Sequence, residues 1–199
     1  MKRLLLIGLI LCSTCSVFAD EQDRASIEKW LQEAVSLSKD SCRTLHFAKK
    51  MLGVPYVAMH MRGTPQTMQS QTDYPNGVVN EVCDYFAKRV ELLKSRGVEN
   101  IILDPGFGFA KSVEQNFELL SELDKLCELG YPVLVGLSRK SMIYRPLGIT
   151  PEEALPGSLA LAWEALRGGE AMVRVHDVAA THQVVELANY YKRVGYDKG

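Results

Sequence analysis

Four short apolar segments, each followed by a polar turn and then by a stretch of helical periodicity, constrain the fold of this chain most strongly. The apolar segments are predicted as strands at 54–61, 100–103, 132–137 and 171–175. Helical spacing of apolar residues follows them at about 78–95, 113–128, 157–167 and 180–193. Buried parallel strands are continuous apolar runs joined through helices, so this alternation predicts parallel βα units and an α/β fold.

Each predicted strand ends in side chains that suit binding or catalysis. The second runs into Asp104 and a glycine-rich turn, within the stretch IILDPGFGFAK that ends at Lys111. The others end at Arg62, at the SRKS stretch 138–141 and at the pair His176-Asp177. Parallel α/β folds place their sites at the carboxyl ends of strands, so a site is predicted there. The alternative is a structural turn residue at Asp104, which the three other strand ends disfavour.

Composition fits a soluble globular protein of one domain. The chain has 199 residues, 47% of them hydrophobic and 24% charged, and a net charge of −1. This charge gives no reason to expect a nucleic-acid or membrane partner. The cysteines show no zinc-ligand spacing beyond the amino terminus.

The amino-terminal segment 1–19 has the anatomy of a secretory signal peptide. A basic start, Met1-Lys2-Arg3, precedes an apolar run and the small-residue site Val17-Phe18-Ala19. There are two alternatives: an amino-terminal anchor, or a chance start codon in front of an unrelated reading frame. Residues 20–44 are polar and predicted to be helical.

Five segments resemble dihydropteroate synthase, a pterin-binding family, and place a domain at 45–199. In chain order they are AMHMRGTPQTMQ, ILDPGFGFAK, VGLSRKSMI, GSLALA and VRVHDV. The resemblance implies a TIM-type (β/α)₈ barrel, of which this chain carries only the last four strands after a helical segment. It also implies a transferase of folate biosynthesis, in the family that sulfonamides target. Such an enzyme condenses dihydropterin pyrophosphate with p-aminobenzoate, uses Mg²⁺, works in the cytoplasm and forms a homodimer. A signal-like amino terminus conflicts with that location.

The resemblance also implies roles for individual residues. Asp104 matches the carboxylate that reads the pterin edge, and Lys140 matches a lysine touching both substrates. Ser141 matches the residue that meets the benzoate carboxylate. Arg174 matches an arginine stacked on the pterin, and His176 a histidine at the pyrophosphate site. Pocket walls are expected at Met59, Gly108, Phe109 and Gly136.

Structural alternatives remain for these residues. Lys140 could simply start a solvated helix, His176 could end a strand, and Arg174 could be structural. Met59 also suits a plain core position. His60 and Arg62 fit core or turn positions as well as site positions.

Several signatures of the family's amino-terminal half do not occur in this sequence. NxTPDSF, GGESTRPG and DTS are absent, and by resemblance they carry the magnesium site, two mobile loops and further pterin contacts. No metal ligand is predicted among the residues present, and impaired activity is expected. The alternatives are a non-catalytic pterin-binding remnant or subunit, and a methyltetrahydrofolate-dependent methyltransferase relative.

Overall fold

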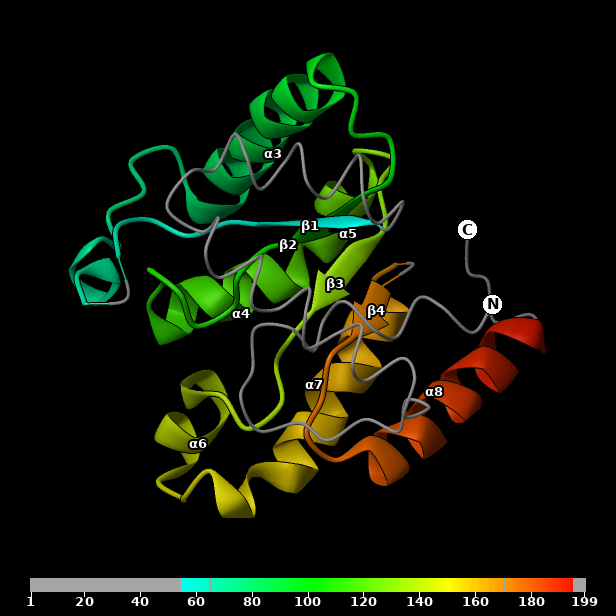
Figure 1. Ribbon diagram of the computed structural model, residues 1–199. Coiled ribbons are helices and arrows are strands. Elements are labelled where there is room, and N and C mark those ends of the chain that lie inside the picture. Colours follow the sequence, from blue (N-terminus) through cyan, green and yellow to red (C-terminus); the bar gives the residue numbers. More distant parts are fainter. Residues whose placement is uncertain (1–54, 65, 170, 195–199) are drawn as a thin grey trace, which may run out of the picture. The chain divides into compact units, whose positions relative to one another are not determined.

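The computed structural model describes residues 55–64, 66–169 and 171–194. The predicted signal-like segment 1–19 and the predicted helical segment 20–44 lie outside these residues. The described elements, in chain order, are β1 Tyr56–Met59, η3 Met68–Ser70, α3 Val78–Ser95, β2 Ile101–Asp104, α4 Val113–Ser121, α5 Leu123–Cys127, β3 Val133–Val135, α6 Ser141–Leu147, η4 Glu152–Ala154, α7 Leu155–Arg167, β4 Ala171–Val173 and α8 Val178–Arg193 (Figure 1).

The strands form one sheet in the order β1-β2-β3-β4, so neighbours in the chain are neighbours in the sheet. β2 and β3 pair in parallel with Leu103 opposite Val133, and β3 and β4 pair in parallel with Val133 opposite Ala171. Helices connect the successive strands, as parallel pairing requires. The predicted α/β class with parallel βα units is therefore confirmed.

The chain divides into two compact units. Of the described residues, one unit comprises 55–57 and 90–101, and within it the Tyr56 N–H donates to the Asn100 carbonyl at 2.7 Å. The other comprises residues 58–89 and 102–199. Every residue that the sequence predicts for the site belongs to this second unit.

The sheet is covered well at its centre. β2 and β3 are buried along their whole length, which is why β3 is apolar throughout and β2 is apolar up to Asp104. α4 packs against α6, and α7 packs against both β4 and α8; Figure 1 shows α7 and α8 side by side. Of the strands that carry the predicted site, β4 is thus held directly by a packed helix, α7.

Helix boundaries follow local signals, and two differ from the prediction. α4 begins with a capping box, in which the Ser112 Oγ accepts from the Gln115 N–H at 3.2 Å. The single helix predicted at 113–128 is two helices, because Glu122 (φ −115°, ψ 32°) leaves the helical conformation between α4 and α5. For α6 the sequence indicated only a helix start near Lys140 and no range, because the helix has seven residues and contains Pro146.

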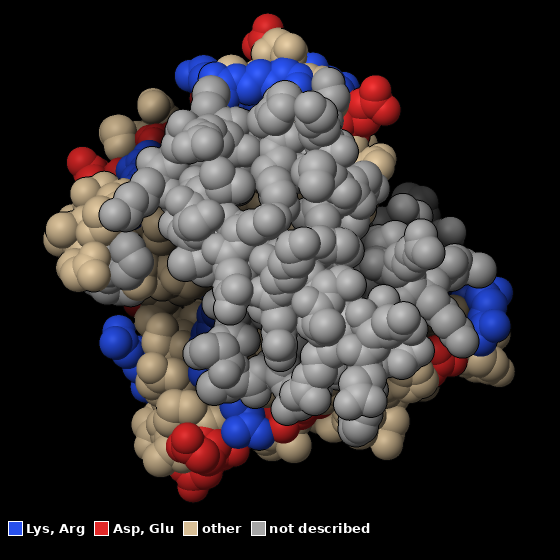
Figure 2. Space-filling view, in the orientation of Figure 1, with Lys and Arg blue, Asp and Glu red and all other residues tan. Residues whose placement is uncertain are grey.

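None of the described helices combines the length and the apolar character that a membrane-spanning segment requires. On the face that Figure 2 shows, acidic and basic side chains both occur on the described part, and neither sign covers it. This distribution agrees with the net charge of −1.

Candidate functional site

Asp104, the last residue of β2, is a buried carboxylate with one unused oxygen. Its side chain is 2% exposed, and the Gly106 N–H donates to its Oδ1 at 2.9 Å. Its Oδ2 has no hydrogen-bond partner among the residues that the structure describes, although Arg174 Nη2 lies 3.6 Å away. Buried polar atoms are nearly always satisfied, so this oxygen is suited to accept hydrogen bonds from a ligand.

The turn after Asp104 requires glycine. Gly106 has a φ of +68°, and a Cβ at this position would lie 2.1 Å from the His60 carbonyl oxygen. This carbonyl belongs to the segment after β1, and the His60 N–H donates to the Asp104 carbonyl at 2.9 Å. The ends of two strands therefore meet at backbone distance, and this contact fixes the level at which Asp104 leaves the sheet.

Lys140 brings a half-buried cation to the same turn. Its Nζ donates to the Phe107 carbonyl and lies 4.8 Å from the centre of the Phe109 ring. Gly108 lies beside the stem, with a φ of +80° that favours glycine; a Cβ there would make only an ordinary contact with Lys140 Cδ, at 3.4 Å. Burial lowers the pKa of Lys140 to about 8; Asp104 opposes this shift and Arg174 adds to it. Lys140 is therefore still mostly protonated at neutral pH.

Arg174 completes the group from the end of β4. Its N–H donates to the Val135 carbonyl at 2.9 Å, which extends the pairing of β3 and β4 by one residue. Its guanidinium lies over Gly136, where a Cβ would be 2.9 Å from Nη2. The structure thus brings together six residues predicted from the sequence: Asp104, Gly108, Phe109, Gly136, Lys140 and Arg174. Met59 is adjacent, because its Cγ lies 3.6 Å from a Cβ placed on Gly106.

Two other predicted residues lie on the neighbouring loops. His176 is exposed, and its Nδ1 lies 3.1 Å from Ser138 Oγ, which also accepts from the His176 N–H at 3.2 Å. Ser141 is the first residue of α6, directly after Lys140. Among the described residues no hydrogen bond or ion pair joins His176 or Ser141 to the carboxylate of Asp104.

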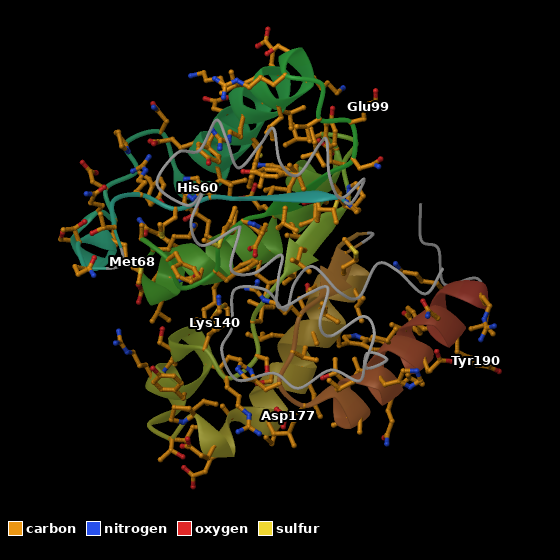
Figure 3. The ribbon with its side chains drawn as sticks, in the orientation of Figure 1. His60, Met68, Glu99, Lys140, Asp177 and Tyr190 are labelled. Carbon is orange, nitrogen blue, oxygen red and sulfur yellow. The ribbon has the colours of Figure 1, made fainter. Side chains whose placement is uncertain are left out.

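An ion pair that the sequence did not reveal connects the two loops. The Arg139 guanidinium donates to both carboxylate oxygens of Asp177, at 2.9 and 2.6 Å. The pKa of Asp177 is lowered by this pairing. Arg139 adopts a φ of 55°, unusual for a residue with a side chain, and its N–H donates to Ser158 Oγ at 2.9 Å. The only sequence signal was the position of both residues beside predicted ones; Figure 3 shows Lys140 and Asp177 at these two loops.

A second missed feature is a buried contact between Lys111 and His60. The two residues are 4% and 2% exposed, and Lys111 Nζ lies 3.0 Å from His60 Nδ1. Burial, together with the nearby charges of Lys111 and Arg62, lowers the pKa of His60 to about 3. Figure 3 shows His60 at the end of β1. A lone lysine in the sequence gave no sign that it would be buried.

The donor set for a metal ion is incomplete in the part of the chain that the structure describes. It contains no group of three or more His, Cys, Asp or Glu side chains that could hold a cation. The described residues alone thus offer no such group for the Mg²⁺ that the resemblance implies.

Comparison with known proteins gives one matching family and many relatives. The family model described as "Pterin binding enzyme" matches residues 30–176. The dihydropteroate synthase of Haemophilus influenzae is 46% identical over 138 residues, which are 68% of this chain and 50% of that protein. The chain spans about half the length of the curated relatives it matches.

Solved structures of the same kind superpose on this chain. A Yersinia pestis dihydropteroate synthase with a sulfonamide drug complex has a TM-score of 0.73 at 33% identity, covering 79% of this chain and 58% of that one. The Thermus thermophilus enzyme in complex with 4-aminobenzoate gives 0.71 at 37%, covering 76% and 59%. Its complex with 6HMPPP gives 0.65 at 39%, covering 69% and 55%.

Proposed function

Because the chain belongs to the pterin-binding enzyme family, we propose that the group around Asp104 is the pterin-binding face of a dihydropteroate synthase site. The observation that carries this proposal is the buried Oδ2 of Asp104, which has no hydrogen-bond partner among the described residues. A pterin ring presents adjacent N–H donors on one edge, and a carboxylate accepts such donors in pairs. The ring would lie against the Gly108-Phe109 wall and the Arg174 guanidinium, where a planar cation can stack on a π system.

The proposed reaction forms one bond and breaks one. The amine nitrogen of p-aminobenzoate bonds to the methylene carbon of dihydropterin pyrophosphate, and the bond from that carbon to the pyrophosphate oxygen breaks. The amine loses a proton, and pyrophosphate leaves as an anion. Positive charge near the breaking bond stabilises the leaving group, and Lys140, Arg174 and His176 are the groups proposed to supply it.

The substrates are proposed from the relatives. Titles of the T. thermophilus structures name 6HMPPP and 4-aminobenzoate as ligands of that enzyme, which supports the same pair here. Ser141, at the start of α6, is proposed to meet the carboxylate of the benzoate. Mg²⁺, a cytoplasmic location and a homodimer remain proposals that rest on the family alone.

A second candidate function is pterin binding without catalysis. It is favoured by the match to only about half of each curated relative and by the lack of a metal-binding group among the described residues. Closure of loops and a metal ion contribute charge stabilisation and exclude water. We therefore expect this 199-residue chain, assayed alone, to form dihydropteroate far more slowly than a full-length family member.

One set of experiments distinguishes three possibilities: a synthase, a pterin binder without catalysis, and a purely structural role for Asp104. Calorimetric titration of 6-hydroxymethylpterin should show binding to the wild type, weaker binding to Asp104→Asn, and unchanged binding to Asp84→Asn, which alters an exposed carboxylate of α3. Product formation from dihydropterin pyrophosphate, p-aminobenzoate and Mg²⁺ then separates synthase from binder. Equal affinity in Asp104→Asn and the wild type would contradict the proposed pterin carboxylate.

A further inference from the structure

Lys111 has a buried side chain for which the proposed reaction gives no role. It is 4% exposed, and its Nζ lies within hydrogen-bond distance of four neutral acceptors. Three are the carbonyl oxygens of Pro105, Gly106 and Phe109, at 2.9, 3.2 and 3.2 Å, and the fourth is His60 Nδ1 at 3.0 Å. Burying an ammonium group is costly, so a lysine at this position requires a reason.

The turn folds around this ammonium group. Every second residue of this turn has a positive φ: 68° at Gly106, 80° at Gly108 and 51° at Ala110. Ala110 is strained in this conformation because it has a Cβ; the Tyr74 hydroxyl donates to its carbonyl at 2.9 Å. With this alternation, three carbonyl groups of the segment face Lys111, and its Nζ donates a hydrogen bond to each.

One residue connects Lys111 to the carboxylate. The Gly106 N–H donates to Asp104 Oδ1, and the Gly106 carbonyl accepts from Lys111 Nζ. His60 provides a second connection, because its N–H donates to the Asp104 carbonyl while its ring meets Lys111. The Asp104 carbonyl and the backbone of Gly106 are therefore both connected to one ammonium group.

We propose that Lys111 is a positioning residue for Asp104, which holds the turn so that Oδ1 stays engaged by Gly106 and Oδ2 stays free for the ligand. The identity of the ligand, a pterin, rests on the proposed function. The geometry of the turn does not depend on it. Lys111 does not touch the ligand in this account. It acts through the Gly106 peptide.

Other charges around Lys111 are consistent with this role. Burial lowers its pKa to about 7, with Asp104 opposing the shift and Lys140 and Arg62 adding to it. The titratable and charged groups that act on it are thus Asp104 at the end of β2, Lys140 ahead of α6, and Arg62 and His60 after β1. The ammonium form therefore predominates below neutral pH, and the neutral amine becomes comparably populated at about pH 7.

Hydrogen exchange measures the turn directly and needs no ligand. The Gly106 amide reports the bond to Asp104, and the Leu103 amide, which donates to the Pro132 carbonyl at 2.9 Å, reports the neighbouring sheet. In Lys111→Met we expect the protection of Gly106 to fall on the order of tenfold more than that of Leu103, as for loss of a charge-assisted hydrogen bond. Lys88→Met, at an exposed position of α3, should leave both unchanged.

Lys111→Gln keeps two N–H donors and should restore part of the Gly106 protection. If Lys111→Met does not fold, the same exchange measurement is made on Lys111→Gln alone. An equal fall at Gly106 and Leu103 in both variants would overturn the positioning role and leave only a contribution to global stability. So would unchanged protection at both amides.

A binding measurement on the same proteins connects the turn to the ligand. 6-Hydroxymethylpterin should bind Lys111→Met on the order of tenfold more weakly than the wild type, with an intermediate value for Lys111→Gln. Equal affinities would overturn the link from the turn to the ligand. If the wild type binds no pterin, the proposed function fails, and the exchange experiment still decides whether Lys111 positions Asp104.

Discussion

Gly106 is the point at which the site is most sensitive to a single atom. A Cβ there would lie 2.1 Å from the His60 carbonyl oxygen, and the residue has a φ of +68°. Gly130 has a similar φ of +76° but no atom within 4 Å of a Cβ. Comparing substitutions at the two glycines therefore separates the destabilisation caused by the backbone conformation from that caused by the contact with His60.

Gly106→Ala should therefore destabilise the chain more than Gly130→Ala. In Gly130→Ala, the control, the left-handed conformation should lower the free energy of unfolding by roughly 1–2 kcal/mol. Gly106→Ala should lower it by about 1–3 kcal/mol more, because the backbone at His60 must also move. Chemical denaturation of both variants measures the difference. Equal losses would show that the end of β1 can yield without cost.

His60 makes stability depend on pH below neutrality. Its pKa in the folded chain is about 3, against an ordinary value of 6.5. The folded state therefore binds fewer protons than the unfolded state between these values, and the free energy of unfolding falls as pH falls through that window. The slope is at most about 1.4 kcal/mol per pH unit for one group.

His60→Gln should flatten this part of the stability profile. Denaturation between pH 6.5 and 3 should show a smaller loss of stability than in the wild type. His182→Gln, which changes an exposed histidine of α8, provides the control. An unchanged slope in His60→Gln would mean that His60 can be protonated in the folded chain.

At the residue scale, the sequence was most informative where chemistry is unusual for its position. Asp104 and Arg174 follow apolar strands, and the structure brings them within 3.6 Å. The pairing of Lys111 with His60 could not be predicted, because it joins residues 51 positions apart and depends on burial. Their roles in binding stay predictions.

At the element scale, the loops after β3 and β4 are joined by Arg139 and Asp177. The pair is bidentate and half-buried, with side chains 31% and 19% exposed. Lys140 and His176 lie next to these residues in the sequence, so the pair links the segments that carry two proposed catalytic groups. A second pair, Arg167 with Glu164, has the same donor and acceptor types on the exposed surface of α7.

A double-mutant cycle should distinguish the two pairs. Arg139→Gln with Asp177→Asn should give a larger coupling free energy of unfolding than Arg167→Gln with Glu164→Gln, because exposed pairs contribute little. Thermal or chemical denaturation of the single and double variants supplies the values. Coupling no larger than in the control pair would leave the two loops independent.

The elements themselves were predictable where their periodic signal was long. The helix expected at 78–95 has the bounds of α3, Val78–Ser95, and all four strands lie within or next to the expected ranges. The extent of α6 was not predicted, because seven residues with an internal proline carry too little periodicity. The break between α4 and α5 is a local change of backbone conformation at Glu122, with no glycine or proline to mark it.

At the scale of the whole molecule, the second unit carries the contacts around Asp104 that the described residues make. Four strands in sequence order bring their carboxyl ends to one edge, and this arrangement was predictable because parallel pairing and continuous apolar runs go together. The rest of the family's site could not be derived from these residues. The chain matches about half of each curated relative.

The central claim, that Asp104 reads the donor edge of a pterin, is tested most directly by varying both partners. Calorimetry would compare 6-hydroxymethylpterin with 6-hydroxymethyllumazine, which carries a 2-oxo group in place of the 2-amino donor, on the wild type and Asp104→Asn. We predict that the wild type prefers the pterin by about 1.5–3 kcal/mol, the range for hydrogen bonds to a charged group, and that the variant loses this preference. Equal preference in both proteins would contradict the account.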